Sequence, residues 1–182
     1  LHATAEDVTA VGRALARAGV LLYQPTLITA PPELTRLALT TIGEASTDGG
    51  ARILGAHLEG PFLAAERAGA HPREWLRAPD LDLLASFLLC GCPVTTVTVA
   101  PELERAHETI EGLLAKGVTV SIGHTDATAP LAHAAFDQGD IHREFAIASH
   151  ELARAVERID QPEALADQRH GALGGGLLGN DG

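Results

Sequence analysis

The 182-residue sequence predicts an α/β fold in which a parallel β-sheet is covered by helices. Helical and extended segments alternate along residues 4–138, an order that is typical of parallel sheets. The predicted strands are short and nearly continuous in apolar residues, as strands buried on both faces are. Aromatic residues make up only 3% of the chain, while Ala and Leu supply most apolar side chains, which favours helix-rich packing over a β-sandwich.

The first two predicted helices begin at recognisable start signals. Thr4 and Asp7 have the spacing of a capping box, with Asp in place of Glu, and predict a helix over residues 4–18. Two consecutive prolines predict the start of a second helix over residues 31–45. The apolar run 20–23 between them predicts a short buried strand.

The rest of the alternation is marked by Gly and Pro at the segment boundaries. Residues 63–79 contain Gly69 and two prolines and predict a long loop, and loops of this length inside compact domains tend to be functional. The remaining predicted elements are strands over 52–58, 94–99 and 118–122, and helices over 80–89, 101–116 and 129–138.

After Gly139 the alternation stops, and no β-branched strand follows where the next one is due. Residues 141–159 instead predict a charged amphipathic helix, and residues 171–182 are rich in Gly. We therefore expect residues 1–139 to form the α/β domain and residues 140–182 to form a helical and Gly-rich tail with little structure of its own. Because the first residue is Leu rather than Met, we also expect the chain to be a fragment.

The composition narrows the choice of partners and compartment. A formal net charge of −11 argues against nucleic acid and anionic membranes as partners, because both need a basic surface, but it allows a small anionic substrate in a local positive pocket. No apolar run reaches the roughly 18 residues of a membrane span. Cys90 and Cys92 are separated by a single residue, a spacing at which a disulfide does not form easily, so a reduced, cytoplasmic location is the simpler inference.

The strongest candidate site is the segment His57-Leu58-Glu59-Gly60-Pro61. His57 and Glu59 share a face of the predicted strand because they are two residues apart. Gly-Pro marks the carboxyl end of that strand, where parallel α/β folds bind ligands. A carboxylate there can hold a divalent cation, and a neighbouring histidine can orient it or bind substrate. The alternative is a structural Glu59 that pairs with a nearby Arg or Lys.

Gly123-His124-Thr125-Asp126 follows another predicted strand in the same way. His124 would lie next to His57 and Glu59 if the two strands are close. The alternative is that Thr125 or Asp126 only caps the helix that follows, and the two interpretations are compatible.

A third candidate lies in the long loop, where Gly69-Ala70-His71-Pro72 combines a folded backbone with a histidine. This composition suits a loop that contacts substrate, and it suits a plain surface loop equally well. His2, His107 and His133 lie within or beside predicted helices and are interpreted as surface or packing residues.

Together these motifs resemble the N-acetylglucosamine-6-phosphate deacetylases, which belong to the amidohydrolase superfamily and have a metal-bearing TIM-type barrel. Five motifs occur in the order typical of that family; they are residues 23–29, 57–63, 69–71, 99–102 and 123–128. The resemblance implies that residues 1–139 form a partial TIM-type (β/α) barrel of the metal-dependent hydrolase superfamily, truncated and followed by a divergent C-terminal part.

The resemblance also implies a chemistry. Glu59 and His124 would bind a divalent metal ion, with Zn²⁺ as the first choice and Fe²⁺ or Mn²⁺ compatible with the same ligands. The ion would activate water to attack the acetamide of N-acetylglucosamine 6-phosphate, which gives glucosamine 6-phosphate and acetate. Ala70 and His71 would contact this amino-sugar phosphate, and a homodimer is the state usual in the family.

The chain departs from the family pattern after Gly139. The next metal-binding histidine is expected there, but Phe145 stands at the matching position. His150 is the expected replacement, and His142 is a second candidate. Arg169 weakly resembles the arginine that holds the phosphate in the family. The family's acid–base Asp would lie beyond residue 182, so no catalytic acid–base residue is assigned.

Two alternatives to an active deacetylase stay open at this point. One is a catalytically inactive, truncated remnant of such an enzyme, because a barrel with strands missing exposes apolar strand edges and should aggregate or dimerise. The other is a different amidohydrolase barrel, such as a dihydroorotase-like or deaminase barrel, although the H-x-H signature of those enzymes is missing from this sequence.

Overall fold

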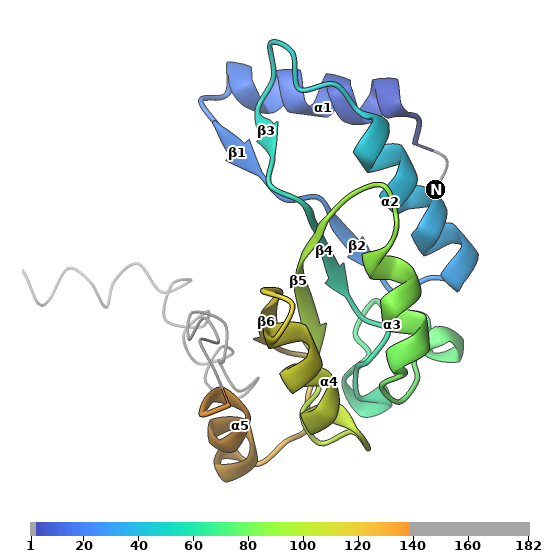
Figure 1. The fold of residues 1–182 in the computed structure, drawn as a ribbon, viewed down its shortest axis with the longest axis vertical. Coiled ribbons are helices and arrows are strands. Elements are labelled where there is room, and N and C mark those ends of the chain that lie inside the picture. Colours follow the sequence, from blue (N-terminus) through green and yellow to red (C-terminus); the bar gives the residue numbers. More distant parts are fainter. Residues whose placement is uncertain (1–2, 139–182) are drawn as a thin grey trace, which may run out of the picture. The chain divides into compact units, whose positions relative to one another are not determined.

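The computed structural model describes residues 3–138, and a four-stranded parallel sheet is the centre of this part of the chain (Figure 1). Its strands lie in the order β2-β4-β5-β6 and all run in the same direction. They are β2 (Thr26–Ile28), β4 (Ala56–Glu59), β5 (Val94–Val99) and β6 (Thr119–Ile122). The short strands β1 (Leu22–Tyr23) and β3 (Arg52–Ile53) form a separate parallel pair. The predicted α/β class with a parallel sheet is therefore confirmed.

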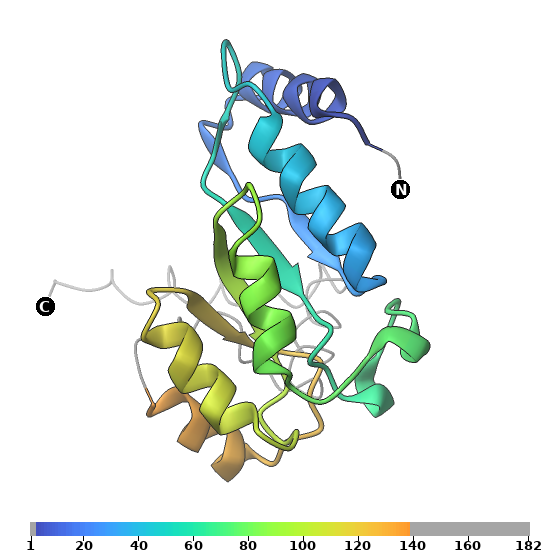
Figure 2. The same ribbon diagram turned by 45° about the vertical axis from the view of Figure 1, so that its right-hand side comes forward.

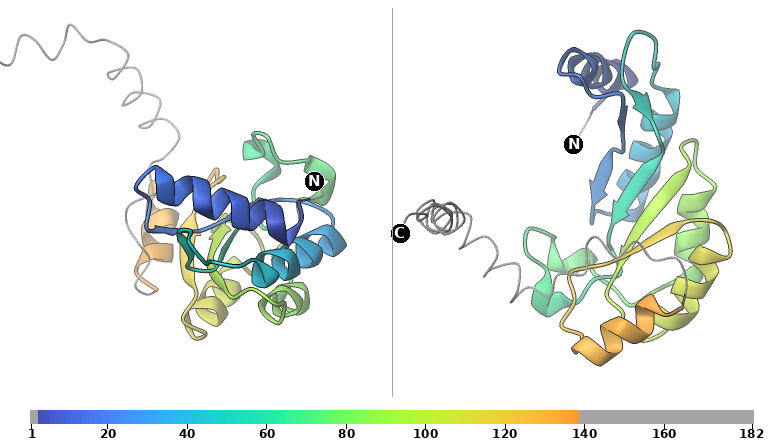
Figure 3. Two further views of the ribbon diagram at one scale, coloured as in Figure 1. Left: turned by 90° about the horizontal axis from the view of Figure 1, so that it is seen from above. Right: turned by 90° about the vertical axis from the view of Figure 1, so that its left-hand side faces the viewer.

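Three crossover helices connect the strands of the main sheet and lie on one face of it (Figure 2; Figure 3, right). They are α2 (Pro32–Glu44), α3 (Leu81–Leu88) and α4 (Ala106–Leu114). α1 (Ala5–Arg17) precedes the sheet and packs against α2, and α5 (Ala129–Phe136) follows β6. A strand followed by a covering helix, repeated along the chain, is the repeating unit of a (β/α) barrel.

The strands alternate in polarity, which corrects the expectation that they are buried on both faces. One set of strand side chains joins the apolar core with the helices; it includes Leu58, Val97 and Val120. The intervening positions are mostly polar, and with Gln24 they surround a cavity of about 460 Å³. The polar members of that lining are Gln24, His57, Glu59, Thr96, Thr98, Thr119 and Ser121. The sheet thus has a helix-covered face and a polar face that can carry chemistry.

The starts of helices α1, α2 and α3 are those that local sequence predicts. The Thr4 side chain accepts from the Asp7 amide, and the Asp7 carboxylate accepts from the Thr4 amide at 2.8 Å, so the predicted capping box is confirmed. α2 begins at Pro32. Asp80 caps α3 by accepting from two backbone amides of its first turn.

Three element boundaries differ from the predictions. Residues 52–58 are not one strand, because Gly55 has φ +134° and separates β3 from β4. β2 was not predicted as a strand, yet the chain stays extended after Pro25 and pairs with β4. Helix α4 begins at Ala106 rather than at residue 101, because residues 101–105 form turns and Arg105 has φ +65°.

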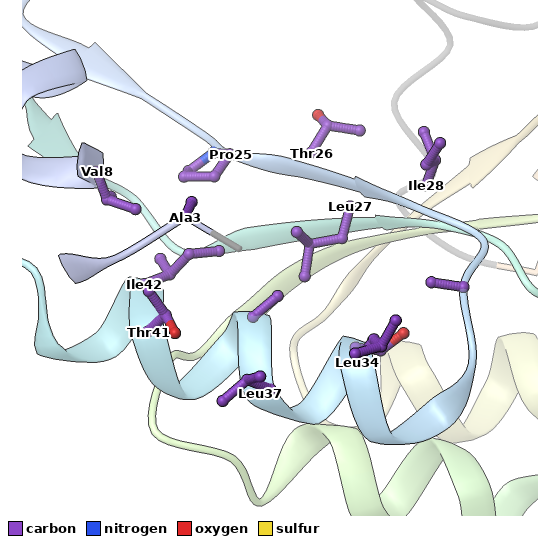
Figure 4. A pocket seen from close by; sticks show the side chains of 13 residues that line it. Ala3, Val8, Pro25, Thr26, Leu27, Ile28, Leu34, Leu37, Thr41 and Ile42 are labelled. Atoms are coloured by element: carbon purple, nitrogen blue, oxygen red, sulfur yellow. The ribbon is translucent and has the colours of Figure 1, made fainter. Parts of the chain in front are cut away.

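A second hollow, of about 260 Å³, lies between β2 and α2 (Figure 4). Leu34 and Leu37 of α2 face Leu27 of β2 across it. None of its lining residues has an ionisable side chain, so this hollow offers neither acid–base groups nor metal ligands. The chemistry therefore has to be sought on the polar face of the sheet.

Two further predictions concern the surroundings of the protein. None of the described helices is long and apolar enough to cross a membrane. Cys90 and Cys92 are both free thiols, as the expectation of an unbridged pair requires.

Candidate metal centre

Three potential metal ligands meet at the carboxyl end of the sheet. Glu59 is the last residue of β4, His124 follows the end of β6, and His71 comes from the loop between β4 and α3. One ligand atom of each lies within 4.8 Å of the others. His57 is not in this group; its Nε2 is 2.8 Å from the Thr98 hydroxyl. Its ring borders the same polar cavity as Glu59.

The protonation of His124 follows from its contacts. Its Nδ1 lies 2.8 Å from the backbone carbonyl oxygen of Arg67. A carbonyl oxygen can only accept, so Nδ1 carries the proton and donates. In the neutral ring Nε2 then presents a lone pair, 2.9 Å from Glu59 Oε1. A lone pair and a carboxylate oxygen repel at this distance unless a cation or a proton lies between them.

The Glu59 and His124 donors fit a divalent transition-metal ion. With metal–ligand bonds of about 2.0–2.1 Å, two ligand atoms lie about 2.8–3.0 Å apart at a right angle and about 3.3–3.4 Å apart at the tetrahedral angle. The observed 2.9 Å falls at the lower end of that span. Metal-binding histidines usually donate their other ring N–H to a backbone carbonyl or carboxylate, as His124 does to Arg67.

Glu59 is not a structural ion-pair residue. Within residues 3–138 its side-chain partners are the rings of His71 and His124, and neither Arg nor Lys pairs with it. The Glu59 side chain is 29% exposed and that of His124 is 27% exposed, so both can be reached from solvent. No Arg or Lys of the described residues therefore supports the alternative of a Glu59–Arg or Glu59–Lys pair.

His71 differs from the other two because its available nitrogen carries a proton. The backbone N–H of Thr29 donates to His71 Nδ1 at 3.2 Å, and the Thr29 hydroxyl is 2.8 Å from the same nitrogen. An amide N–H can only donate, so Nδ1 is the acceptor and the ring proton is on Nε2, which lies 3.9 Å from Glu59 Oε1. Although His71 is close enough to be counted with the ligands, this tautomer offers a hydrogen-bond donor instead of a lone pair.

Burial also keeps the His71 ring neutral. The residue is 5% exposed, and this burial lowers its pKa, an effect that His124 reinforces and Glu59 opposes. The plain surface loop considered for this segment is therefore wrong for His71, although Ala70 beside it is exposed. Burial likewise lowers the pKa of His57, and Glu59 opposes the effect.

The turn that carries His124 is held from two sides. On one side the Ala64 amide donates to the His124 carbonyl at 3.0 Å, and the Arg67 guanidinium contacts the Asp126 carboxylate. On the other side Glu102 accepts from the Thr125 hydroxyl and from the Asp126 amide. Thr128 occupies the N-cap position of α5, so the alternative in which Thr125 or Asp126 caps that helix is wrong.

Sequence reasoning missed three residues that support the site: Thr29, Arg67 and Glu102. Thr29 and Glu102 are the last residues of two of the five motifs, but nothing in those motifs indicates a role for either. Arg67 contributes its carbonyl oxygen to His124, and nothing in its local sequence indicates this. Gly60 matters in a related way, because a Cβ built there would lie 2.0 Å from the Thr29 hydroxyl oxygen.

The remaining predicted site residues are placed elsewhere or lie outside the description. His150, its alternative His142 and the phosphate-contacting candidate Arg169 lie outside the described residues. His107 is on α4 and pairs with Glu111, and His133 is on α5 beside Phe136. Neither joins the Glu59 group.

Comparison with known proteins gives a consistent result, although no family model matches the chain. The N-acetylglucosamine-6-phosphate deacetylase of Rattus norvegicus is 42% identical over 136 residues, which are 72% of this chain and 33% of the rat protein. The enzyme of the same name from Vibrio furnissii is 34% identical over 142 residues, 76% of this chain and 36% of that protein. The chain thus spans about a third of the length of the curated relatives it matches.

Solved structures agree with the sequence relatives. The N-acetyl-D-glucosamine-6-phosphate deacetylase of Mycobacterium smegmatis, a variant in complex with N-acetyl-D-glucosamine-6-phosphate, superposes with a TM-score of 0.64 at 36% identity, covering 72% of this chain and 34% of that one. The Thermotoga maritima enzyme gives a TM-score of 0.65 at 26% identity, covering 73% and 36%. The described sheet and helices are therefore part of a (β/α) barrel of the amidohydrolase type.

Sequence identity of 34–42%, the shared order of strands and helices, and the Glu59–His124 pair at the sheet edge all point the same way. Over about 70% of its length, this chain is similar to the N-acetylglucosamine-6-phosphate deacetylases, of which it spans about a third.

Proposed function

We propose that this chain carries part of the catalytic site for metal-dependent hydrolysis of N-acetylglucosamine 6-phosphate to glucosamine 6-phosphate and acetate. The observation that carries the proposal is the pairing of His124 Nε2 with Glu59 Oε1 at 2.9 Å, in a ring whose other nitrogen is bound to a backbone carbonyl. The relatives' names supply the reaction, and one solved relative was crystallised with N-acetyl-D-glucosamine-6-phosphate.

In this proposal Glu59 and His124 hold the metal ion, which is Zn²⁺ by preference, with Fe²⁺ or Mn²⁺ as alternatives. When bound, the ion supplies Lewis-acid polarisation of the acetamide carbonyl and lowers the pKa of water. Glu59 contributes the negative charge that attracts a cation. The Arg67 carbonyl keeps the His124 proton on Nδ1, so that Nε2 stays available as a ligand.

His71 acts on the substrate in this proposal. Its Nε2–H faces the Glu59 and His124 side chains, where it can donate a hydrogen bond to the acetamide oxygen as negative charge develops there. The ring is buried, so this hydrogen bond is stronger than it would be in water. Ala70, in the same loop, contacts the sugar through its backbone.

The rest of the site is assigned from the sequence resemblance alone. We assign His150 as the next metal ligand, with His142 as its alternative, and Arg169 as the contact to the substrate phosphate. These three residues lie outside the described range, so their assignment rests on their places in the sequence. Each is open to test by substitution.

We place the chain in the cytoplasm as a homodimer. Free thiols at Cys90 and Cys92 suit a reducing compartment. Apolar side chains at the hollow between β2 and α2 are exposed, among them Ile28 at 44% and Leu37 at 55%, and their exposure favours a covering partner. Light scattering of the purified chain distinguishes a monomer from a dimer.

Acetate release tests the function. The full chain, loaded with Zn²⁺, is incubated with N-acetylglucosamine 6-phosphate, beside the Glu59→Gln variant and a matched control, Glu66→Gln, in the exposed 65–67 turn. We expect turnover in the parent and the control, and loss in Glu59→Gln. Metal binding without acetate release would identify a metal-binding chain without deacetylase activity, and failure of both would contradict the whole proposal.

A further inference from the structure

His124 has a backbone conformation that its neighbours must maintain. Its φ is +50°, in the left-handed region that residues with a Cβ rarely occupy. Such conformations persist only where the surrounding structure fixes them, and they gather at functional sites. Two contacts are made by His124 itself: its Nδ1 donates to the Arg67 carbonyl, and its own carbonyl accepts from the Ala64 amide at 3.0 Å.

The residues immediately after His124 are bound by one carboxylate. The Thr125 hydroxyl donates to one oxygen of Glu102 and the Asp126 amide donates to the other, each at 2.5 Å. The Ala127 amide in turn donates to the Thr125 hydroxyl oxygen at 2.9 Å. Glu102 therefore accepts hydrogen bonds from two successive residues of the turn, Thr125 and Asp126. Its bond to the Thr125 hydroxyl also orients that group to accept from the Ala127 amide.

Glu102 comes from a different part of the sheet edge than the two ligands. It lies in the turn after β5, the strand between β4 and β6, whereas Glu59 ends β4 and His124 follows β6. Among the described residues its hydrogen bonds go to Thr125 and Asp126, and none goes to the His124 ring or to Glu59. Glu102 can therefore affect the candidate metal centre only through the conformation of the turn that carries His124.

The ion pair on the opposite side of this turn is weaker than the Glu102 contacts. Arg67 pairs with Asp126, but their side chains are 47% and 55% exposed, and ion pairs of this kind contribute little because water screens them. Hydrogen bonds in which one partner is ionised are shorter and stronger than neutral ones. The Glu102 contacts belong to that class and involve a backbone amide, so they fix the main chain directly.

We infer that Glu102 is a positioning residue, whose carboxylate holds the 123–126 turn in the conformation that aims His124 at Glu59. This inference rests on the proposed role of His124 as a metal ligand, but the hydrogen bonds of Glu102 are made entirely by residues of the chain itself. Glu102 touches neither metal nor substrate, and it acts only by keeping the imidazole in place before a ligand arrives.

The test uses the full, ¹⁵N-labelled, metal-free chain and four variants. Glu102→Ala removes both hydrogen bonds. Glu102→Gln is the conservative rescue, because its amide oxygen can accept from the Asp126 N–H and its NH₂ can donate to the Thr125 oxygen. Thr125→Val removes one arm and keeps the carboxylate. Glu104→Ala is the matched control, an exposed glutamate of the same turn that makes no hydrogen bond within residues 3–138.

Two nuclear magnetic resonance readouts are followed: the protected His124 Nδ1–H signal and the exchange rate of the Asp126 amide. In Glu102→Ala we expect loss of the first and at least about tenfold acceleration of the second. Glu102→Gln should keep the His124 signal and the slow exchange of the Asp126 amide. Thr125→Val should give values between those of the parent and Glu102→Ala, and Glu104→Ala should give the parent's values. An unchanged His124 signal in Glu102→Ala would overturn the inference, and so would a Glu102→Gln variant that behaves like Glu102→Ala.

A parallel Zn²⁺ titration separates this inference from the proposed function. If the parent binds Zn²⁺, we expect the dissociation constant to rise about tenfold or more in Glu102→Ala and to stay near the parent value in Glu102→Gln. If the parent binds no Zn²⁺, the proposed function fails while the resonance readouts still decide whether Glu102 braces the turn. If Glu102→Ala does not fold, Thr125→Val decides: a parent-like His124 signal there counts against the brace.

Discussion

Replacing Gly60 by Ala should destabilise the chain and disturb the site together. Gly60 follows Glu59 and has φ +98°, a conformation that residues with a side chain rarely adopt. A Cβ there would lie 2.0 Å from the Thr29 hydroxyl oxygen and 3.2 Å from a Leu63 methyl carbon. Thr29 is the residue that holds His71 Nδ1, so the clash reaches the candidate site directly.

The expected cost combines two terms. Forcing Ala into this backbone region costs on the order of 1–3 kcal/mol. Relieving a contact of 2.0 Å requires Thr29 to move, and overpacking of this kind costs roughly another 1–3 kcal/mol. We therefore expect Gly60→Ala to lower the free energy of unfolding by about 2–6 kcal/mol, which is enough to unfold a marginally stable chain.

Urea denaturation followed by circular dichroism measures this loss. The matched control is Gly112→Ala in helix α4, where an added Cβ meets nothing within 4 Å, and helix propensity predicts a gain of about 0.5–1 kcal/mol. The two substitutions are chemically identical and should change stability in opposite directions. A Gly60→Ala variant as stable as the parent would refute the packing of Gly60 against Thr29.

Three further predictions concern single side chains. His71→Phe removes the Nε2–H donor, so acetate release should fall about 10²–10³-fold while the affinity for Zn²⁺ stays the same. A parallel loss of Zn²⁺ affinity would show that His71 is a metal ligand instead. Cys92 is buried, and its burial raises the pKa of the thiol. An alkylating reagent at neutral pH should therefore modify Cys90 first, and it should modify Cys92 only at higher pH or after unfolding. Mass analysis of the peptides identifies which cysteine has reacted. Hydrogen bonds from the Thr4 amide and hydroxyl lower the pKa of Asp7 in the folded chain. The carboxylate therefore stabilises the fold above the unfolded pKa near 3.8, and this stabilisation is lost as the pH falls through the lower folded pKa. In urea denaturation at a series of pH values, Asp7→Asn should lack this part of the acid dependence of the midpoint.

Local features of the fold could be predicted from the sequence, because their partners are near in the chain. The capping box at Thr4 and the Asp80 cap of α3 lie within three residues of the amides that they bind. β2 could not be predicted in this way, because it is short and forms only by pairing with β4. The break at Gly55 depends on Thr95, whose side chain would lie 2.5 Å from a Cβ at that position.

In the candidate site, too, the residues that could be predicted are those that depend on local sequence. Glu59 and His124 could be predicted because both lie at the carboxyl ends of strands that finish at the same edge of a parallel sheet. The burial of His71 could not, since it depends on Thr29, which is 42 residues away. The partners of Glu102, Thr125 and Asp126, are 23 and 24 residues away from it in the sequence, and nothing in the segment around Glu102 indicates which turn it binds.

Metal binding by Glu59 and His124 tests the central claim most directly. Zn²⁺ is titrated calorimetrically into the full chain and into Glu59→Gln, His124→Asn and the control His107→Asn on the exposed surface of α4. We predict about one equivalent bound by the parent and by His107→Asn, with affinity reduced at least about tenfold in the other two. Glu59→Gln and His124→Asn variants that bind Zn²⁺ as tightly as the parent would contradict the account.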